Sequence, residues 1–109
     1  MPEQTPPVID VDSIIANQQA RQRQPQPPNM WAVLLWNDPV TPFGFVIAVL
    51  QQVFNHDEGA AQAIMLKAHN DGFAVCAVHP KDVAETKVSN ASHQSRSYGY
   101  PLQFTAQEA

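Results

Sequence analysis

The sequence has few basic residues and no long apolar run, and each scarcity excludes a class of protein. Only 6 of the 109 residues are Lys or Arg, the formal net charge is -4, and no stretch forms a basic face. Because phosphate neutralisation supplies most nucleic-acid affinity, we expect no nucleic-acid binding. No apolar run reaches the roughly 18 residues of a membrane span. The N-terminus also lacks a basic segment followed by an apolar core, so we expect neither a membrane segment nor a secretory signal.

Cysteine and glycine are also scarce. Cys76 is alone, which excludes an internal disulfide and fits a reducing cytoplasm. The 4 glycines are scattered and form no phosphate-binding loop. The histidines, at positions 56, 69, 79 and 93, do not have the spacing of a helical metal-binding pair with a nearby carboxylate. We therefore expect no metal, no cofactor and no catalytic residue. A metal or catalytic site stays as the remote alternative, which stoichiometric metal in a purified sample would revive.

Proline is abundant but unevenly placed. Six of the ten prolines lie in residues 1–28, together with the Gln-rich run "NQQARQRQPQPP". Such a composition buries too little apolar surface to offset the entropy of ordering a chain. We therefore predict a flexible N-terminal extension over residues 1–28 and one folded domain over residues 29–109.

The stretch "VIDVDSII" is an exception within this extension. Its apolar residues follow a helical spacing and could share one face of a short helix when a partner is present. These residues are Val8, Val11, Ile14 and Ile15. A solvated tail with a few apolar residues is the alternative of equal weight.

The apolar pattern after residue 29 predicts the order strand, helix, helix, strand, helix, strand. We expect strands at 31–36, 73–79 and 102–106, and helices at 42–54, from 56 or 58 to a stop at 70–72, and from 80 to a break at 97–101. This order indicates an α+β domain, in which three helices pack on one face of a mostly antiparallel three-stranded sheet.

Local signals mark the helix ends. Thr41 offers a hydroxyl N-cap, and Pro42 is a preset first helical residue. Asn55 or Asp57 caps the second helix, and the "NDG" ending at Gly72 stops it. The inner face of this second helix is predicted to hold Ala61, Ile64, Met65 and Ala68, with His69 as a further candidate.

Four stretches carry a recognisable pattern: "LLWNDPVTPFGFV", "AIMLKAHNDG", "VAETKV" and "YPLQFTAQEA". Together they resemble the ClpS family, the adaptors that deliver proteins with destabilising N-terminal residues (N-degrons) to the AAA+ unfoldase of the Clp protease. The middle two are the most specific. The resemblance extends from about Trp31 to Ala109 and implies the α+β fold described above. It also implies that the N-terminal extension enters the unfoldase pore, with a simple tether as the alternative.

A free N-terminus is an ammonium with three donors, so its recognition needs several acceptors beside an apolar socket. Asn37 offers an amide oxygen, Asp38 a carboxylate, and His69 a ring nitrogen when neutral. The resemblance implies that these three meet at one rim, above a socket for the first side chain. The socket residues that it implies are Thr41, Phe43, Val46, Met65, Ala68 and Leu102, with Phe43 at the entrance and Thr41 supporting the loop.

Each of these residues also has an ordinary structural interpretation. Asn37 and Asp38 are common turn residues, and Met65 is by default core filler. A lone histidine on an apolar helix face is more often a core residue. The joint match in order and spacing outweighs these alternatives. The resemblance further implies that Asp82 and Lys87 dock the N-terminal domain of a ClpA-like or ClpC-like unfoldase, and we expect a cytoplasmic monomer.

Four positions depart from the usual pattern of the family, one of them Gly44, which replaces an acidic residue and loosens the start of the first helix. Pro39 stands where the loop usually has an acidic residue, and one lost charge-assisted hydrogen bond costs roughly 1.5–3 kcal/mol. Phe43 replaces the usual Met at the entrance, and Ala68 replaces a frequent Val in the socket. We read these two as an exchange of size, with a bulkier entrance over a roomier floor. Peptides that begin with Leu, Phe, Tyr or Trp remain the expected ligands.

A regulator is the main alternative. Such a protein would keep the unfoldase-docking surface but have a weakened or altered N-degron pocket, and Pro39 and Phe43 are its support in the sequence. Binding of the unfoldase without binding of N-degron peptides would identify it.

Overall fold

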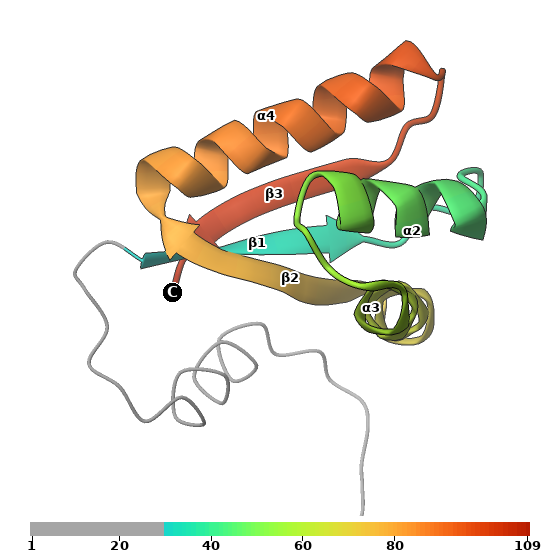
Figure 1. Cartoon of the computed structure of the whole chain (residues 1–109), viewed down its shortest axis with the longest axis horizontal. Coiled ribbons are helices and arrows are strands. Elements are labelled where there is room, and N and C mark those ends of the chain that lie inside the picture. Colours follow the sequence, from blue (N-terminus) through green and yellow to red (C-terminus); the bar gives the residue numbers. More distant parts are fainter. Residues whose placement is uncertain (1–29) are drawn as a thin grey trace, which may run out of the picture.

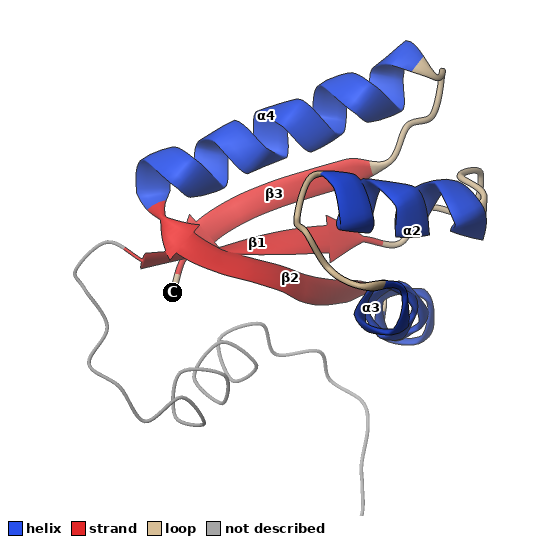
Figure 2. Ribbon diagram, in the orientation of Figure 1, coloured by secondary structure: helices blue, strands red, loops and turns tan. Residues whose placement is uncertain are grey.

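The computed structural model describes residues 30–109, which form a three-stranded antiparallel sheet and three helices (Figures 1 and 2). The strands are β1 (Met30–Trp36), β2 (Phe73–Pro80) and β3 (Gln103–Glu108), and the helices are α2 (Phe43–Gln52), α3 (Glu58–Asp71) and α4 (Lys81–Ser97). The predicted fold and element order are confirmed. The flexible extension over 1–28, its helical patch and the start of the domain at residue 29 lie outside the described residues.

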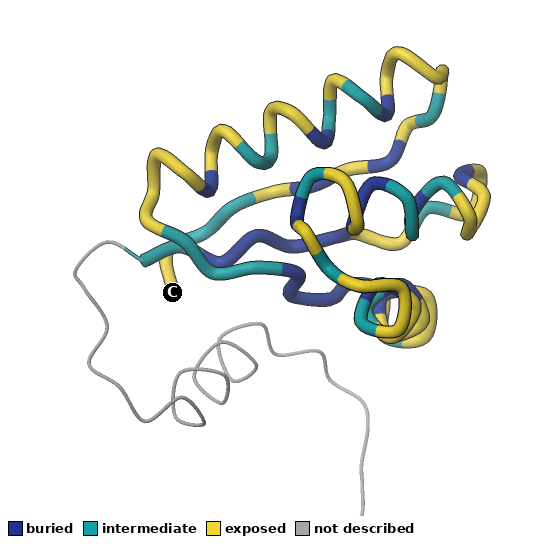
Figure 3. The backbone as a smooth tube through the Cα atoms, in the orientation of Figure 1, coloured by how far each residue is buried: buried dark blue, intermediate teal, exposed yellow. Residues whose placement is uncertain are grey.

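β1 is the central strand of the sheet and pairs with β2 on one side and with β3 on the other. Its residues from 32 to 35 are fully buried, which explains the unbroken apolar run of this strand (Figure 3). Val33 and Leu35 face the helices, whereas Ala32 and Leu34 point to the opposite face, because side chains alternate along a strand. Both faces of the central strand are therefore apolar.

A β-bulge interrupts the pairing of β1 with β2. Val33 lies opposite Ala77 and Leu34 opposite Val75, so that Cys76 is the extra residue on β2. The Cys76 thiol is buried and donates to the carbonyl oxygen of Val33 at 3.5 Å.

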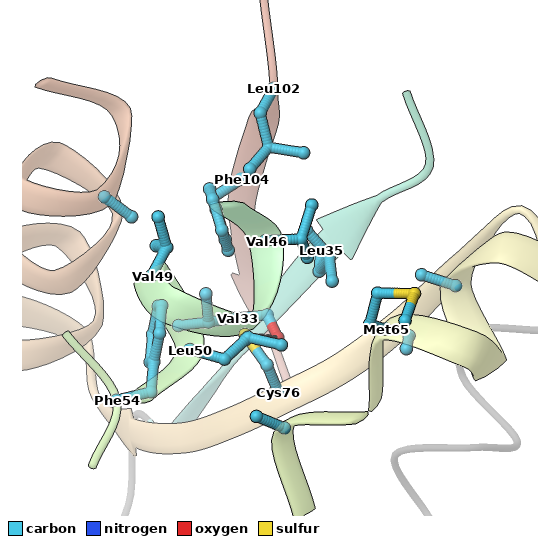
Figure 4. Packing of buried hydrophobic residues seen from close by; sticks show 14 of the residues in the cluster. Val33, Leu35, Val46, Val49, Leu50, Phe54, Met65, Cys76, Leu102 and Phe104 are labelled. Carbon is cyan, nitrogen blue, oxygen red and sulfur yellow. Dashed lines mark hydrogen bonds between the residues drawn. The ribbon is translucent and has the colours of Figure 1, made fainter. Parts of the chain in front are cut away.

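All three helices pack into one core with the helix-facing side of the sheet (Figure 4). The helices contribute Val46, Val49, Leu50, Ala61, Met65, Ala68, Ala84 and Ala91, and the strands contribute Val33, Leu35, Ala74, Cys76 and Phe104. Burial of one Leu or Val side chain contributes about 1.5–3 kcal/mol, so this core supplies most of the favourable free energy of folding. None of the helices between residues 30 and 109 has both the length and the apolar character needed to cross a bilayer.

The ends of α3 follow the sequence signals. Asp57 is the N-cap, and its Oδ1 accepts from the backbone N–H of Ala60 at 2.7 Å. Asn55, the other candidate, instead occupies the left-handed region at a φ of 60°. Gly72 ends the helix at a φ of 94°, and its N–H donates to the carbonyl of Ala68 at 2.8 Å. The predicted helix stop is therefore confirmed.

Two local predictions are wrong. Thr41 is not the N-cap of α2: the helix begins at Phe43 with Pro42 as its N-cap, and the Thr41 hydroxyl donates to the Asp38 carboxylate. His69 is exposed and does not lie on the inner face of α3. At about 100° per residue, position 69 falls beyond the stripe that Met65 and Ala68 bury.

Candidate functional site

The loop after β1 is held in one shape by hydrogen bonds at both of its ends. The backbone N–H of Asn37 donates to the carbonyl of Gly72 at 3.0 Å, which ties the end of β1 to the end of α3. Oδ2 of Asp38 accepts from the backbone N–H of Thr41 at 2.9 Å and also from the Thr41 hydroxyl. The buried Thr41 therefore fixes the orientation of the Asp38 carboxylate.

Two side-chain oxygens of this loop are left available to a ligand. Asn37 is exposed and Asp38 is half-buried. Among residues 30–109, the side chain of Asn37 and the Oδ1 atom of Asp38 have no hydrogen-bond partner. An ionised carboxylate accepts several hydrogen bonds and an amide oxygen two, so the loop presents unfilled acceptors to solvent.

A pocket opens beside this loop, between α2, α3 and the segment that leads into β3. The space between its lining residues is about 240 Å³, a figure that includes open solvent. The pocket is therefore small and open on one side. The lining residues are Leu35, Trp36, Asn37, Asp38, Thr41, Phe43, Val46, Met65, Ala68 and Leu102.

The depth of the pocket is apolar and its edge is polar. Val46, Met65, Ala68 and Leu102 are each less than a tenth exposed. They come from α2, α3 and the segment before β3, so that three separate parts of the chain form the walls. The acceptors of the β1–α2 loop lie at the edge of the same cavity. This arrangement suits a ligand with one apolar group and one hydrogen-bond donor next to it.

Phe43 stands at the entrance and is 46% exposed. Its ring meets the imidazole of His69 edge-on, with the ring centroids 5.1 Å apart and an interplanar angle of 74°. His69 does not line the pocket itself but lies next to it through this contact. The structure thus brings together every predicted socket residue with Asn37 and Asp38, and places His69 beside them.

The position of Leu102 depends on an arginine in the last turn of α4. Nη1 of Arg96 donates to the carbonyl oxygens of Tyr100 at 3.0 Å and of Leu102 at 2.8 Å. These two bonds hold the segment between α4 and β3 against the end of the helix. Leu102 is therefore kept in the pocket wall by backbone contacts as well as by its own burial.

Sequence reasoning missed two lining residues, Leu35 and Trp36. The apolar run of β1 assigned both to the strand core, and Leu35 does belong to that core. The signal that could have identified them is their position directly before Asn37, because a strand end that opens into a binding loop also contributes to the wall of the site.

The two residues predicted to dock an unfoldase lie on α4. Asp82 is exposed in the first turn of this helix, and Lys87 is half-buried one turn further on. Figure 1 shows the start of α4 at the opposite end of the sheet from the β1–α2 loop. Nζ of Lys87 donates to the carbonyl of Val53 at 2.8 Å, so this ammonium also links α4 to the end of α2.

Within the described part of the chain, residues 30–109, two titratable groups have shifted pKa values, and both lie on β2. Burial raises the pKa of the Cys76 thiol well above its usual range, so the thiol is protonated at neutral pH. Burial, and then the positive charge of Lys87, lower the pKa of His79. Neither residue lines the pocket, and among residues 30–109 no three His, Cys, Asp or Glu side chains form a cluster able to hold a metal ion.

The fold and the site together define a small α+β domain that has a largely apolar pocket with polar groups at its edge. The model of the family described as "ATP-dependent Clp protease adaptor protein ClpS" matches residues 26–105. The chain belongs to this family, the ClpS adaptors of the Clp protease.

Similar proteins agree with this assignment. The ATP-dependent Clp protease adapter protein ClpS of Leptothrix cholodnii is 44% identical over 104 residues, which are 95% of this chain and 89% of the relative. The ClpS of Herminiimonas arsenicoxydans is 46% identical over 83 residues, 76% of this chain and 81% of the relative. A solved structure, Agrobacterium tumefaciens ClpS2 bound to L-phenylalaninamide, has a TM-score of 0.74 at 38% identity and covers 76% of this chain and 100% of its own. The resemblance drawn from the sequence is confirmed.

Proposed function

We propose that this chain binds proteins that begin with a bulky apolar residue and delivers them to a Clp AAA+ unfoldase-protease in the cytoplasm. One observation supports this most directly: oxygens of Asn37 and Asp38 that have no hydrogen-bond partner among residues 30–109 lie at the edge of a small apolar pocket. An N-terminal residue has an ammonium and an apolar side chain on the same carbon atom. It therefore matches both parts of the site at once.

The ammonium of the ligand binds at the loop. The pKa of an α-amino group is about 7.7–8.0, so it is mostly charged at neutral pH and has three N–H donors. Asp38 supplies charge and Asn37 a neutral acceptor, while Thr41 holds the carboxylate in place. Acetylation removes the charge and leaves one donor, so an acetylated N-terminus loses this set of contacts.

His69 is the third proposed partner of the ammonium. Its exposed ring lies beside Phe43 at the entrance, within reach of a ligand that enters the pocket. Only a neutral imidazole can accept a hydrogen bond from the ammonium. His69→Ala is therefore expected to weaken peptide binding, and unchanged binding would remove His69 from this role.

The similar structure of A. tumefaciens supports the type of ligand. That protein is bound to L-phenylalaninamide, which combines a free α-amine with a phenylalanine side chain. By analogy, the apolar side chains of N-terminal Leu, Phe, Tyr and Trp would enter the pocket between Val46, Met65 and Leu102 of this chain.

Delivery requires a second surface. We assign the docking of the N-terminal domain of a ClpA-like or ClpC-like unfoldase to α4, through Asp82 and the charged part of Lys87. Asp82 is exposed, and its side chain has no hydrogen-bond partner among residues 30–109, whereas Lys87 also supports the fold. Because α4 begins at the far end of the sheet from the β1–α2 loop (Figure 1), one monomer can hold substrate and unfoldase together. The adaptor itself performs no catalysis.

The first experiment is fluorescence anisotropy with labelled peptides that differ only in their first residue. Leu, Phe, Tyr, Trp, Val, Met and Ser are compared, each with a free and an acetylated N-terminus. Preference for free Leu, Phe, Tyr or Trp over free Ser, lost on acetylation, is the expected result. Binding of the unfoldase domain without any peptide preference would instead identify the regulator that lacks a working pocket.

A further inference from the structure

The face of the sheet that points away from the helices is apolar and almost without solvent exposure. Ala32 and Leu34 are 0% exposed, Phe73 is 1% and Val75 is 9%. These four residues, here called the outer sheet face, form a core cluster separate from the one that the helices cover. An antiparallel sheet with helices on one face commonly has polar side chains on its other face, whereas this face is apolar.

The apolar neighbours of the outer sheet face among residues 30–109 lie within the sheet itself. Val78 packs against the cluster from within β2. The ring of Trp36 lies 5.5 Å from that of Phe73, but Trp36 is itself 36% exposed, and its Nε1 donates sideways to the hydroxyl of Thr105 at 2.7 Å. Each of these neighbours belongs to the sheet, and α2, α3 and α4 contribute nothing to the cluster.

We propose that the outer sheet face is the docking site of residues 8–15 of the same chain. The segment that precedes β1 is the part of this protein outside the described residues, and it enters the sheet at Met30. From Ile15 to Met30 an extended chain reaches about 50 Å. The seven residues of β1 span only about 23 Å, so the tether allows residues 8–15 to return along the whole face.

The composition of this segment matches the surface. "VIDVDSII" is the apolar part of an otherwise Pro- and Gln-rich stretch. In a helical register, Val8, Val11, Ile14 and Ile15 share one side, and Asp10 and Asp12 fall on its two flanks. The outer sheet face has no charged residue in its cluster, so the acidic flanks would remain in water at its edges.

Docking has two consequences that do not depend on the proposed function. Ile14 and Ile15 cannot bind the outer sheet face and another protein at the same time, so the docked segment is withheld from any partner. Trp36 borders both the outer sheet face and the pocket. The ring of Trp36 therefore lies next to both the proposed docking site of residues 8–15 and the pocket.

Methyl NMR with a spin label tests the proposal on the full chain. The variant Ala16→Cys is labelled with a nitroxide, while the buried Cys76, with its raised pKa, stays unmodified, as the labelled parent chain verifies. Loss of most of the methyl signal of Leu34 and Val75, with Val49 and Leu50 of the inner core retained, is the expected result. Equal loss on both faces, or no loss at all, would overturn the proposal.

Matched variants identify the contact. Adding Ile14→Asp and Ile15→Asp to the labelled chain is expected to restore the signals of Leu34 and Val75. The pair Gln18→Asp and Gln19→Asp adds the same charge without removing apolar groups and is expected to leave the loss unchanged. A mixed sample, in which one chain has the label and another has the enriched methyl groups, must show no loss. Loss in that mixture would assign the face to a second copy and reject docking within the chain.

Discussion

The ring of Phe43 meets the imidazole of His69 edge-on, with 5.1 Å between the ring centroids. This contact joins the first residue of α2 to the last turn of α3 across the entrance of the pocket. Ala68, the neighbour of His69, forms part of the wall below. Two of the positions at which the sequence departs from the family pattern, 43 and 68, therefore lie at the same pocket, and one can change its opening while the other changes its depth.

Restoring the larger residue in the wall is expected to exclude the largest ligands. Ala68→Val adds two methyl groups to a side chain that is 2% exposed and lines the pocket. We expect about tenfold weaker binding, or roughly 1.4 kcal/mol, for peptides that begin with Trp or Phe, and little change for Leu. Peptide anisotropy measures the effect.

Ala63→Val is the matched control for this change. It makes the same substitution at an exposed position of α3, outside the pocket. Equal losses of affinity for Trp, Phe and Leu peptides, or the same loss of affinity in Ala63→Val, would show that the pocket wall at Ala68 does not select ligands by size.

The carboxylate of Asp38 is expected to contribute more to binding than the loop shape that it maintains. Asp38→Ala removes a charge-assisted hydrogen bond to the ammonium, which is about 1.5–3 kcal/mol or roughly 10- to 100-fold in affinity. Thr41→Val removes only the hydroxyl bond to Asp38 and is expected to cost less than a factor of ten. Anisotropy with a free Leu peptide compares them. Similar losses in both variants would assign the effect to loop shape.

Lys87 is expected to stabilise the fold, independently of any unfoldase. Its Nζ donates to the carbonyl of Val53 at 2.8 Å in a partly buried place, so Lys87→Met should lower the free energy of unfolding by about 1 kcal/mol in urea titrations. Lys67→Met breaks the exposed pair with Asp71 and should cost only about 0.3–0.5 kcal/mol. A smaller effect at Lys87 than at Lys67 would contradict this role.

The thiol of Cys76 is expected to resist alkylation in the native protein. It is 3% exposed, and burial raises its pKa, so both access and thiolate formation are suppressed. Iodoacetamide at pH 8 should modify the native chain slowly and the urea-unfolded chain quickly, as mass spectrometry would show. Rapid modification without denaturant would mean that β2 opens readily at its bulge.

Stability is expected to fall as the pH decreases from 7 to 5, with a contribution from His79. The pKa of His79 is lowered in the folded state, by burial and then by Lys87, relative to about 6.5 in an unfolded chain. In this interval the unfolded state binds more protons, so the free energy of unfolding decreases with decreasing pH. His79→Gln should make the decrease smaller in urea titrations at each pH. An unchanged slope would show that other groups cause it.

Much of the fold could be predicted from the sequence because its signals are local. The strand and helix periods, the Asp57 cap and the left-handed stop at Gly72 each depend on residues within about four positions. The same local reasoning failed at Thr41. Its hydroxyl has two possible uses, a cap for α2 or a partner for Asp38, and only the path of the loop decides between them.

The candidate site was predicted by a different route, because its residues were selected by their match to a family pattern. Periodicity alone placed Met65 and Ala68 in a helix core and Leu102 at a strand end. It could not show that they share a pocket with Val46, because that depends on how α2, α3 and the segment before β3 pack. Leu35 and Trp36 were missed for the same reason.

By itself, the sequence determined the order of the elements, most of their ends and the family to which the chain belongs. Tertiary packing alone decided which face of β1 the helices cover, that Lys87 reaches Val53, and that Phe43 meets His69 over the pocket. The physical reason is the range of the interactions. Backbone propensity and capping act between neighbours in the chain, whereas a pocket exists only where side chains from distant segments pack without filling the space between them.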